Sequence, residues 1–247
     1  MSTKVALEVF RYRPEESEEP TFQTYEVDCP DDWVLLDALN HIKNDIDGTL
    51  SYRWSCRMGV CGSCGMNVNG EPVLTCATYC KDFANGTVRI EPLAHFPVIR
   101  DLVVDSTDFM DKIESVKPWI IRDEEKPLEE GEYLQSPGEL LDYKQYTLCI
   151  NCMLCYAACP IYARHPVFTG PAALALGQRY NLDSRDQGED ERRSVFAGPE
   201  GVWECTFVGD CTRVCPKHVD PAGAIQQGKA RHLQWWAKKV LMPWANK

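Results

Sequence analysis

The chain has 247 residues and a formal net charge of −11, and 44% of its residues are hydrophobic. This length suits one or two modest globular domains, and the acidic balance argues against nucleic acid as a partner. No window approaches the roughly 18 consecutive apolar residues that a transmembrane helix needs, so none is expected.

Cysteine usage indicates the redox compartment. Thirteen cysteines would suggest disulfides in a secreted protein. The N-terminal segment, however, has no apolar core and turns acidic by Glu15, so it resembles neither a signal peptide nor an Arg-rich transit peptide. We therefore expect a reducing cytoplasm, where thiolates stay available for metal.

The N-terminal elements follow from hydrophobic periodicity. Residues 4–12 and residues 21–28 alternate apolar and polar side chains, which predicts two paired strands. Asp31 or Asp32 can cap a following helix that extends to about Ile46. The apolar side chains of this segment recur at helical spacing.

A cysteine loop comes next. Residues 56–64 read C-R-M-G-V-C-G-S-C, and another cysteine follows at position 76. This C-x4-C-x2-C…C spacing is that of plant-type [2Fe–2S] ferredoxins. The glycines of the loop let backbone amides approach the cluster. The predicted [2Fe–2S] ligands are Cys56, Cys61, Cys64 and Cys76.

Two more cysteines lie near this motif. Cys80, four residues after Cys76, is the alternative fourth ligand. We favour Cys76 because it directly follows a predicted strand and the motif asks for a single distant cysteine. Cys29 has no partner at metal-ligand spacing and is interpreted as a free thiol.

A hairpin and a last strand complete the first domain. Segments 66–69 and 71–75 flank an Asn69-Gly70 turn, which predicts a hairpin, and residues 87–91 predict a strand. Together with the earlier elements, this order indicates a β-grasp [2Fe–2S] ferredoxin-like domain over residues 1–105.

The character of the chain changes near residue 106. A helical segment and an acidic linker rich in Pro and Gly lead into residues that we expect to be mostly helical. Residues 171–180 predict a helix, and the polar residues 183–201 predict a surface excursion. Asp220 can cap a last helix that starts at Pro221. The expected fold class is α+β, with a helical bacterial-type ferredoxin domain over residues 106–247.

Two cysteine–proline runs dominate this second domain. Residues 149–160 read C-I-N-C-M-L-C-Y-A-A-C-P, the C-x2-C-x2-C-x3-C-P run of bacterial-type clusters, whose fourth cysteine serves another cluster. Residues 205–216 supply the partner run, with Val208 at one cysteine position. Crosswise pairing predicts a [4Fe–4S] cluster held by Cys149, Cys152, Cys155 and Cys215.

Val208 leaves the other cluster one ligand short. Valine has no lone pair for iron, and a cubane that lacks a ligand can lose that iron. The prediction is a [3Fe–4S] cluster held by Cys159, Cys205 and Cys211. Zinc knuckles or disulfides are the alternative, which such specific spacing disfavours. Three clusters imply sequential one-electron transfer.

The C-terminal segment, residues 229–247, is amphipathic. Its apolar positions approximate one face, with Lys and Arg elsewhere: Leu233, Trp236, Val240, Leu241 and Trp244. Two interpretations stay open. The face packs on its own domain, or it docks against a membrane subunit or the lipid headgroup region, where Trp is favoured.

Three stretches, residues 53–64, 149–160 and 205–221, resemble the iron–sulfur subunit of the fumarate reductase/succinate dehydrogenase family. The resemblance covers nearly the whole chain and includes Val208. It implies a subunit that joins a flavoprotein, which carries FAD and the dicarboxylate site, to two hydrophobic membrane anchor subunits. It also implies a peripheral position on the cytoplasmic face of the bacterial inner membrane and no dicarboxylate site on this chain.

The direction of electron flow rests on finer features of the resemblance. Succinate dehydrogenases of this family usually carry Trp shortly after the first Cys–Pro pair, and often His after the first cysteine of the second run. Here these regions contain Ile161-Tyr162 and Thr206. The resemblance therefore implies menaquinol-dependent fumarate reduction in anaerobic respiration. Succinate oxidation in the citric acid cycle is the alternative.

The same branch implies a quinone pocket at the anchor interface. Its candidate residues are Gln226 and Lys229, and the Lys229 ammonium can hydrogen-bond a quinone oxygen. A surface lysine is the alternative interpretation. Two other classes of protein stay open: a subunit of a different flavin-linked oxidoreductase, and a colourless zinc module without redox chemistry.

Overall fold

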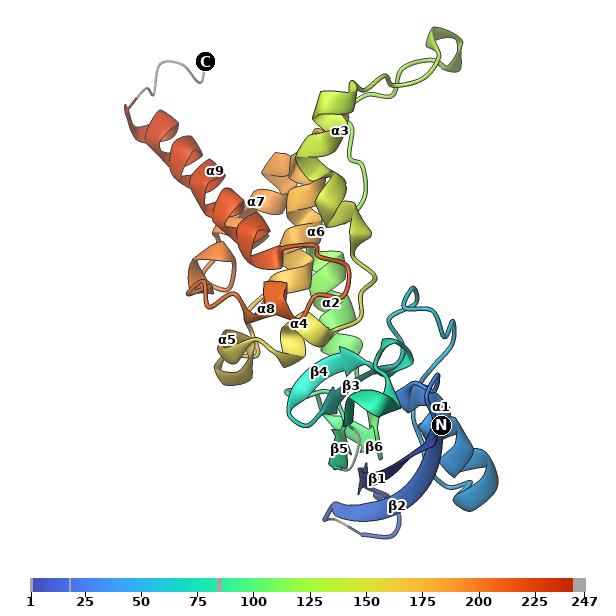
Figure 1. Ribbon diagram of the computed structural model, residues 1–247. Helices are drawn as coiled ribbons and strands as arrows, with labels where there is room; N and C mark the ends of the chain where they lie inside the picture. The colour runs from blue at the N-terminus through green and yellow to red at the C-terminus, as the bar shows by residue number, and fades with distance from the viewer. Residues whose placement is uncertain (1, 18, 84–85, 242–247) are drawn as a thin grey trace. The chain divides into compact units, whose positions relative to one another are not determined.

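The computed structural model describes residues 2–17, 19–83 and 86–241. Backbone contacts divide the chain into two compact units. The first comprises Met1–Asp108 and Ile150–Ala158, and the second comprises Phe109–Cys149 and Cys159–Lys247. The strands lie in the blue to green part of the chain, and most helices lie in the later part (Figure 1).

The first unit is built on a mixed five-stranded sheet in the order β2-β1-β5-β3-β4. The strands are β1 Ser2–Arg11, β2 Thr21–Pro30, β3 Gly65–Val68, β4 Glu71–Leu74 and β5 Thr87–Glu91. β1 pairs antiparallel with β2 and parallel with β5, while β3 pairs antiparallel with both β4 and β5. The two strands predicted from alternation in residues 4–12 and 21–28 are confirmed.

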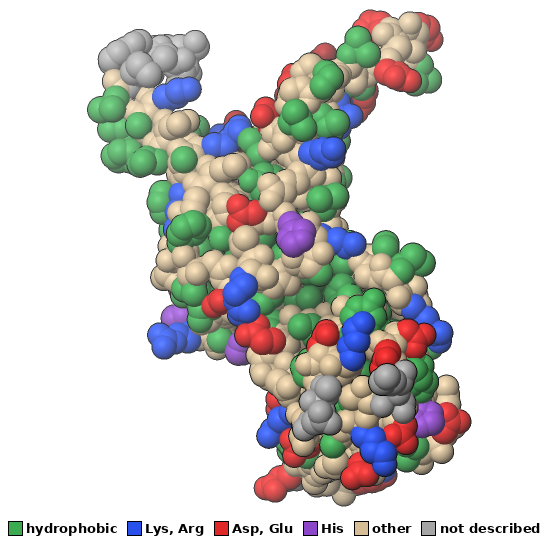
Figure 2. All heavy atoms as spheres, viewed as in Figure 1, with side chains coloured by type: hydrophobic (Ala, Val, Ile, Leu, Met, Phe, Trp, Pro, Cys, Tyr) green, Lys and Arg blue, Asp and Glu red, His purple; other side chains and the backbone are tan. Residues whose placement is uncertain are grey.

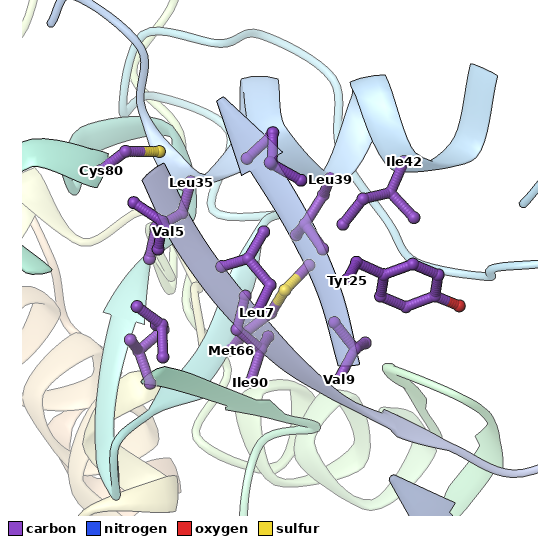
Figure 3. Close-up of a cluster of buried hydrophobic side chains, with 14 of the residues drawn as sticks. Val5, Leu7, Val9, Tyr25, Leu35, Leu39, Ile42, Met66, Cys80 and Ile90 are labelled. Carbon is purple, nitrogen blue, oxygen red and sulfur yellow. The ribbon is translucent and has the colours of Figure 1, made fainter. Parts of the chain in front are cut away.

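One helix covers this sheet. α1, Leu35–His41, continues as a π-helical turn over Ile42–Ile46. Leu35, Leu39 and Ile42 face side chains of β1 and β5, including Leu7 and Ile90, all of them buried (Figure 3). A helix packed on a mixed sheet around this core is the predicted β-grasp domain.

The predicted helix cap was wrong. Neither Asp31 nor Asp32 caps α1, because both lie in a turn closed by the bond from the Trp33 amide to the Pro30 carbonyl. The helix begins only after Val34, which forms an isolated bridge with Tyr79. The Leu35 amide bonds the Thr78 carbonyl at 2.8 Å. Pairing with the segment after β4 therefore delays the start of the helix.

The predicted hairpin turn between β3 and β4 is confirmed. Asn69 and Gly70 have φ values of 51° and 84°, as an Asn-Gly turn requires. A small second sheet was not predicted. It pairs β6, Val98–Arg100, with β7, Val103–Val104. These strands are too short to leave a periodic signal.

The second unit is helical. Its helices are α2 Thr107–Ser115, α3 Pro137–Tyr143, α5 Pro160–Arg164, α6 Pro171–Asn181, α7 Glu189–Ala197, α8 Asp210–Arg213 and α9 Pro221–Leu241. α6 and α9 pack on each other (Figure 1). The predicted helix at 171–180 and the predicted start at Pro221 are confirmed, and the Gly223 amide donates to the Asp220 carboxylate at 3.0 Å. α4, Leu154–Ala157, belongs to the first unit.

The expected surface excursion at 183–201 was wrong, since it contains α7. Arg192 and Phe196 of this helix are fully buried. The Arg192 guanidinium pairs with Asp186 at 2.7 Å and donates to the carbonyls of Val116 and Trp119. The sequence alone does not show that an arginine is buried and fully paired, and most arginines are exposed, so this segment was expected at the surface.

Candidate metal centres

The loop after α1 surrounds the sulfur of Cys56 with amides. The N–H groups of Met58, Val60 and Cys61 point at Cys56 Sγ from 3.4, 3.3 and 3.3 Å. Arg57, with φ of 59°, and the positive-φ glycines of the loop bend the chain so that its amides face inward. Such donors stabilise a thiolate and the sulfurs of a bound cluster.

The other cysteines of this motif lie beside the loop. Hydrogen bonds from the Cys56 amide and from Ser63 lower the pKa of Cys61 to about 6. Burial, together with the Cys64 thiol, raises the pKa of Cys76 to about 11, although the Gly59 amide opposes this. The structure thus brings the four predicted [2Fe–2S] thiols together, with Cys76 on the 3-10 turn that follows β4.

Cys80 lies elsewhere, in the hydrophobic core under the sheet. Its thiol hydrogen-bonds the thiol of Cys29, and burial raises the pKa of both groups. Cys80 and Cys29 are both fully buried (Figure 3 labels Cys80). The fourth thiol beside the loop is therefore that of Cys76. Cys29 forms no disulfide, as expected of a free thiol, and its sulfur accepts the hydrogen bond from Cys80.

Three cysteines of the second unit line one cavity. They are Cys159, Cys205 and Cys211, and the remaining walls are mostly apolar, with Phe168 and Ile225 among them. Burial raises the pKa of Cys211 to about 12, and the neighbouring sulfurs of Cys159 and Cys205 add to the effect. Burial likewise raises the pKa of Cys159, against the Tyr162 amide, which bonds its sulfur at 3.4 Å.

This donor set fits an iron–sulfur cluster. Thiolates so close together in an apolar cavity repel one another unless cationic metal compensates their charge. Val208 lines the same cavity and is 59% exposed. It lies between Phe207 and Gly209, whose φ values are 62° and 90°. Val208 thus shares a pocket with the three cysteines and is flanked by two residues in the left-handed region of backbone conformation.

The cysteines predicted for the remaining cluster fall in both units. Cys152 and Cys155 belong to the first unit, where both are buried. Cys149 and Cys215 belong to the second, where both pack against an apolar cluster around Tyr146. Across the described residues, no three His, Cys, Asp or Glu side chains surround a single metal-ion position.

Gln226 and Lys229 lie one turn apart on α9. Lys229 Nζ donates to the Cys205 carbonyl at 2.7 Å, so its charge lies beside the three-cysteine cavity. Gln226 Nε2 is buried and has no hydrogen-bond partner in the described part of the chain. Sequence reasoning named both residues but missed the bond to Cys205, which depends on a fold that brings residues 24 positions apart together.

Two contacts of the cysteine loop also escaped sequence reasoning. The Arg57 guanidinium stacks over the Trp54 ring, 4.4 Å from its centroid. Gly62 and Gly65 lie against the backbone of Cys152. In the sequence, glycines in this loop indicate only that backbone amides can approach a cluster. Nothing in the local sequence predicts that they also contact residue 152.

The distal half of α9 carries exposed apolar side chains, visible as a green cluster near the end of that helix (Figure 2). Leu233, Trp236, Val240 and Leu241 are 53–68% exposed, so this face does not pack on its own unit. Trp244, which was expected on the same face, lies outside the described residues. No described helix is both long and apolar enough to cross a membrane.

Comparison with known proteins identifies the family to which this chain belongs. Residues 6–111 match the model of a 2Fe-2S iron-sulfur cluster binding domain, and residues 145–219 match that of a 4Fe-4S dicluster domain. The chain is 59% identical over 246 residues to a fumarate reductase iron-sulfur subunit of Mycobacterium tuberculosis (strain CDC 1551 / Oshkosh), with 100% of both chains covered. The chain belongs to the family of fumarate reductase and succinate dehydrogenase iron–sulfur subunits.

Further relatives agree with this membership. A succinate dehydrogenase iron-sulfur subunit of Coxiella burnetii is 39% identical over 229 residues, covering 92% of this chain and 96% of its own length. A chain in the Mycobacterium smegmatis Sdh1 complex in the apo form superposes with a TM-score of 0.84 at 27% identity, covering 94% of this chain and 96% of its own. The protein is an electron-transfer subunit of an oxidoreductase complex.

Proposed function

We propose that this subunit serves a membrane-bound quinol:fumarate reductase, in which electrons from menaquinol reduce fumarate to succinate. The observation that carries this direction is the identity of 59% to a subunit named for fumarate reductase, against 39% to one named for succinate dehydrogenase. Ile161-Tyr162 and Thr206, where succinate dehydrogenases usually place Trp and His, favour the same direction.

The proposed cluster ligands follow from motif spacing and from the grouping of thiols. They are Cys56, Cys61, Cys64 and Cys76 for [2Fe–2S]; Cys149, Cys152, Cys155 and Cys215 for [4Fe–4S]; and Cys159, Cys205 and Cys211 for [3Fe–4S]. The proposed domains are residues 1–105 and 106–247. When bound, the clusters supply one-electron carriers that link a two-electron quinol to a two-electron flavin.

The chain's own groups hold these centres and set their surroundings. The amides around Cys56 Sγ offset negative charge at the exposed edge of the loop. Burial of Cys159 and Cys211 limits access of water to their sulfurs. We assign Val208 as the vacant ligand position, since its side chain offers nothing to iron.

Quinone binding is proposed beside the three-cysteine cavity. A lysine ammonium has three donors, so Lys229 can bond the Cys205 carbonyl and a quinone oxygen at once. The buried, unpaired Nε2 of Gln226, one turn away, is a second donor that a ligand oxygen would satisfy. Both residues project from the same face of α9.

The partners proposed are a flavoprotein with FAD and the dicarboxylate site, and two hydrophobic anchor subunits. The exposed Leu233, Trp236, Val240 and Leu241 of α9 supply an apolar face for the anchor, on the same helix as Lys229. This arrangement holds the subunit peripherally on the cytoplasmic face of the bacterial inner membrane.

The test compares both directions in the isolated complex. Quinol-driven fumarate reduction should exceed succinate-driven quinone reduction when each is measured with menaquinone and with ubiquinone analogues. A complex that oxidises succinate faster, and prefers ubiquinone, would support the alternative, a succinate dehydrogenase of the citric acid cycle.

A further inference from the structure

Gly62 contacts the ligand segment of a second cluster within the first unit. A Cβ built on Gly62 would lie 2.8 Å from the Ile150 carbonyl oxygen, 2.9 Å from Cys152 Cα and 3.0 Å from Cys152 Cβ. Gly62 directly follows Cys61, a proposed [2Fe–2S] ligand, and Cys152 is a proposed [4Fe–4S] ligand. The backbone of the proposed [2Fe–2S] loop at Gly62 therefore contacts Cys152, a ligand of the proposed [4Fe–4S] cluster.

The contact excludes any side chain at position 62. Two of the three nearest atoms are backbone atoms, which cannot rotate away as the end of a flexible side chain would. An alanine would have to push the Ile150 carbonyl from 2.8 Å to an ordinary contact of at least 3.4 Å. Gly62 also has a φ of 74°, which L-residues rarely adopt.

Gly65 extends the same contact. Its built Cβ would lie 3.1 Å from both the Cys152 carbonyl oxygen and Leu154 Cδ2. Gly65 is not among the positive-φ residues, so its lack of a side chain is explained by packing alone. The two glycines thus flank Cys64, and both face the segment around Cys152.

We propose that Gly62 is a positioning residue for electron transfer between the [2Fe–2S] and [4Fe–4S] centres. It brings the two ligand segments into van der Waals contact, so that the electron crosses there. This inference rests on the proposed ligand assignment. In the step, one centre loses a single electron and the other gains it, with no bond broken and no proton moved. The probability of such a transfer falls exponentially with the distance between the centres and is greater through packed atoms than across a gap.

The test uses Gly62→Ala in the assembled complex. With both centres reduced, each is paramagnetic, and the [2Fe–2S] spin relaxes faster the closer the second centre lies. We expect slower [2Fe–2S] spin relaxation in Gly62→Ala, together with several-fold slower electron redistribution between the two centres after rapid mixing with a reductant. Both signals should remain at full intensity.

Gly59→Ala is the matched control. Gly59 belongs to the same loop and has a φ of 66°, but a Cβ there would meet nothing within 4 Å. It carries similar backbone strain without the contact and keeps the backbone amide that faces Cys76, so its [2Fe–2S] relaxation should stay at the wild-type rate. Equal slowing in both variants would attribute the effect to loop strain and overturn the proposal.

Three other results would also test the proposal: failed assembly, unchanged relaxation and missing cluster signals. If Gly62→Ala fails to assemble, Gly65→Ala replaces it, and there too the relaxation should slow, though less. Unchanged relaxation in whichever variant assembles, with both signals present, overturns the role of Gly62 but leaves the cluster assignment intact. Absence of the cluster signals from the wild-type complex would overturn the assignment itself.

Discussion

Lys229 Nζ lies 2.7 Å from the carbonyl oxygen of Cys205, which joins the middle of α9 to a cysteine of the three-thiol cavity. A cation held there stabilises negative charge on either side of it, on the cavity and on a ligand that approaches α9. The same ammonium has further N–H donors for the quinone proposed to bind beside α9.

Replacing this lysine should separate two activities. Lys229→Ala is expected to impair quinol-driven fumarate reduction while fumarate reduction by an artificial dye donor stays nearly intact, because only the quinone step needs the ammonium. Steady-state assays with both donors measure this. Lys238→Ala, an exposed lysine on the same helix, is the control and should change neither activity. Equal loss of both activities in Lys229→Ala would point to damaged assembly instead.

A cysteine at position 208 should change the third cluster. Val208 lines the cavity of the three sulfurs, so Val208→Cys is expected to supply a fourth ligand and convert the three-iron centre to [4Fe–4S]. The EPR signal of the oxidised three-iron centre should then disappear. Val208→Ala, which offers no ligand, should keep it. A three-iron signal that persists unchanged in Val208→Cys would refute the assignment of the vacancy.

The fourth ligand of the first cluster can be tested directly. Cys80→Ala should lower the thermal stability of the protein, because it removes a fully buried side chain, but should keep the [2Fe–2S] signal. Cys76→Ala should abolish or strongly change that signal. The reverse pattern of signals would identify Cys80 as the ligand.

A buried ion pair stabilises the first unit. Arg11 Nε bonds Asp101 Oδ1 at 3.1 Å, and the side chain of Asp101 is fully buried. Asp101→Ala leaves the guanidinium without this partner and should cost about 3–5 kcal/mol in the free energy of unfolding. Removing the exposed partner of Arg13 by Glu16→Ala should cost about 0–1 kcal/mol. Denaturant unfolding measures both, and similar small losses would contradict the account.

The same network predicts a pH dependence of stability. Although burial opposes ionisation of Asp47, hydrogen bonds from Thr49, Arg11 and Tyr25 hold the pKa of its carboxyl far below the usual range. The contribution of Asp47 is therefore complete above the unfolded pKa of about 4 and is lost as the pH falls below it. Burial, then the bond to Asp47, raises the pKa of Tyr25 to about 12. Its contribution is present below about pH 10 and is lost as the pH rises from there.

Thermal unfolding across the pH range checks this. Asp47→Asn should be less stable than wild type near neutral pH and should show a flatter loss of stability on the acid side. An acid limb as steep as that of wild type would assign the pH dependence to other carboxyl groups.

Local patterns are enough to predict most elements of the fold. Period-two alternation locates β1 and β2, and Asn69-Gly70 locates the hairpin turn, because each is determined by adjacent residues. The errors arise where distant residues decide. The start of α1 depends on the bond from Leu35 to Thr78, and α7 depends on burial of Arg192 among carbonyls of residues 116–119.

The candidate sites likewise contain features that local sequence predicts and features that depend on distant residues. Cysteine spacing alone groups Cys159 with Cys205 and Cys211, because the ligand pattern of a cluster is a property of the sequence. The contact of Gly62 with Cys152 and the bond of Lys229 to Cys205 have no such pattern. Both depend on how the loops fold back, which no local sequence signal records.

The most direct test of the central claim, three clusters of different nuclearity on this chain, is low-temperature EPR of the isolated complex, oxidised and then reduced in steps. We predict a three-iron signal in the oxidised sample and a [2Fe–2S] signal on mild reduction. A sample with no three-iron signal, holding only cubane clusters or no iron, would contradict the assignment of Val208 and of the cysteines around it.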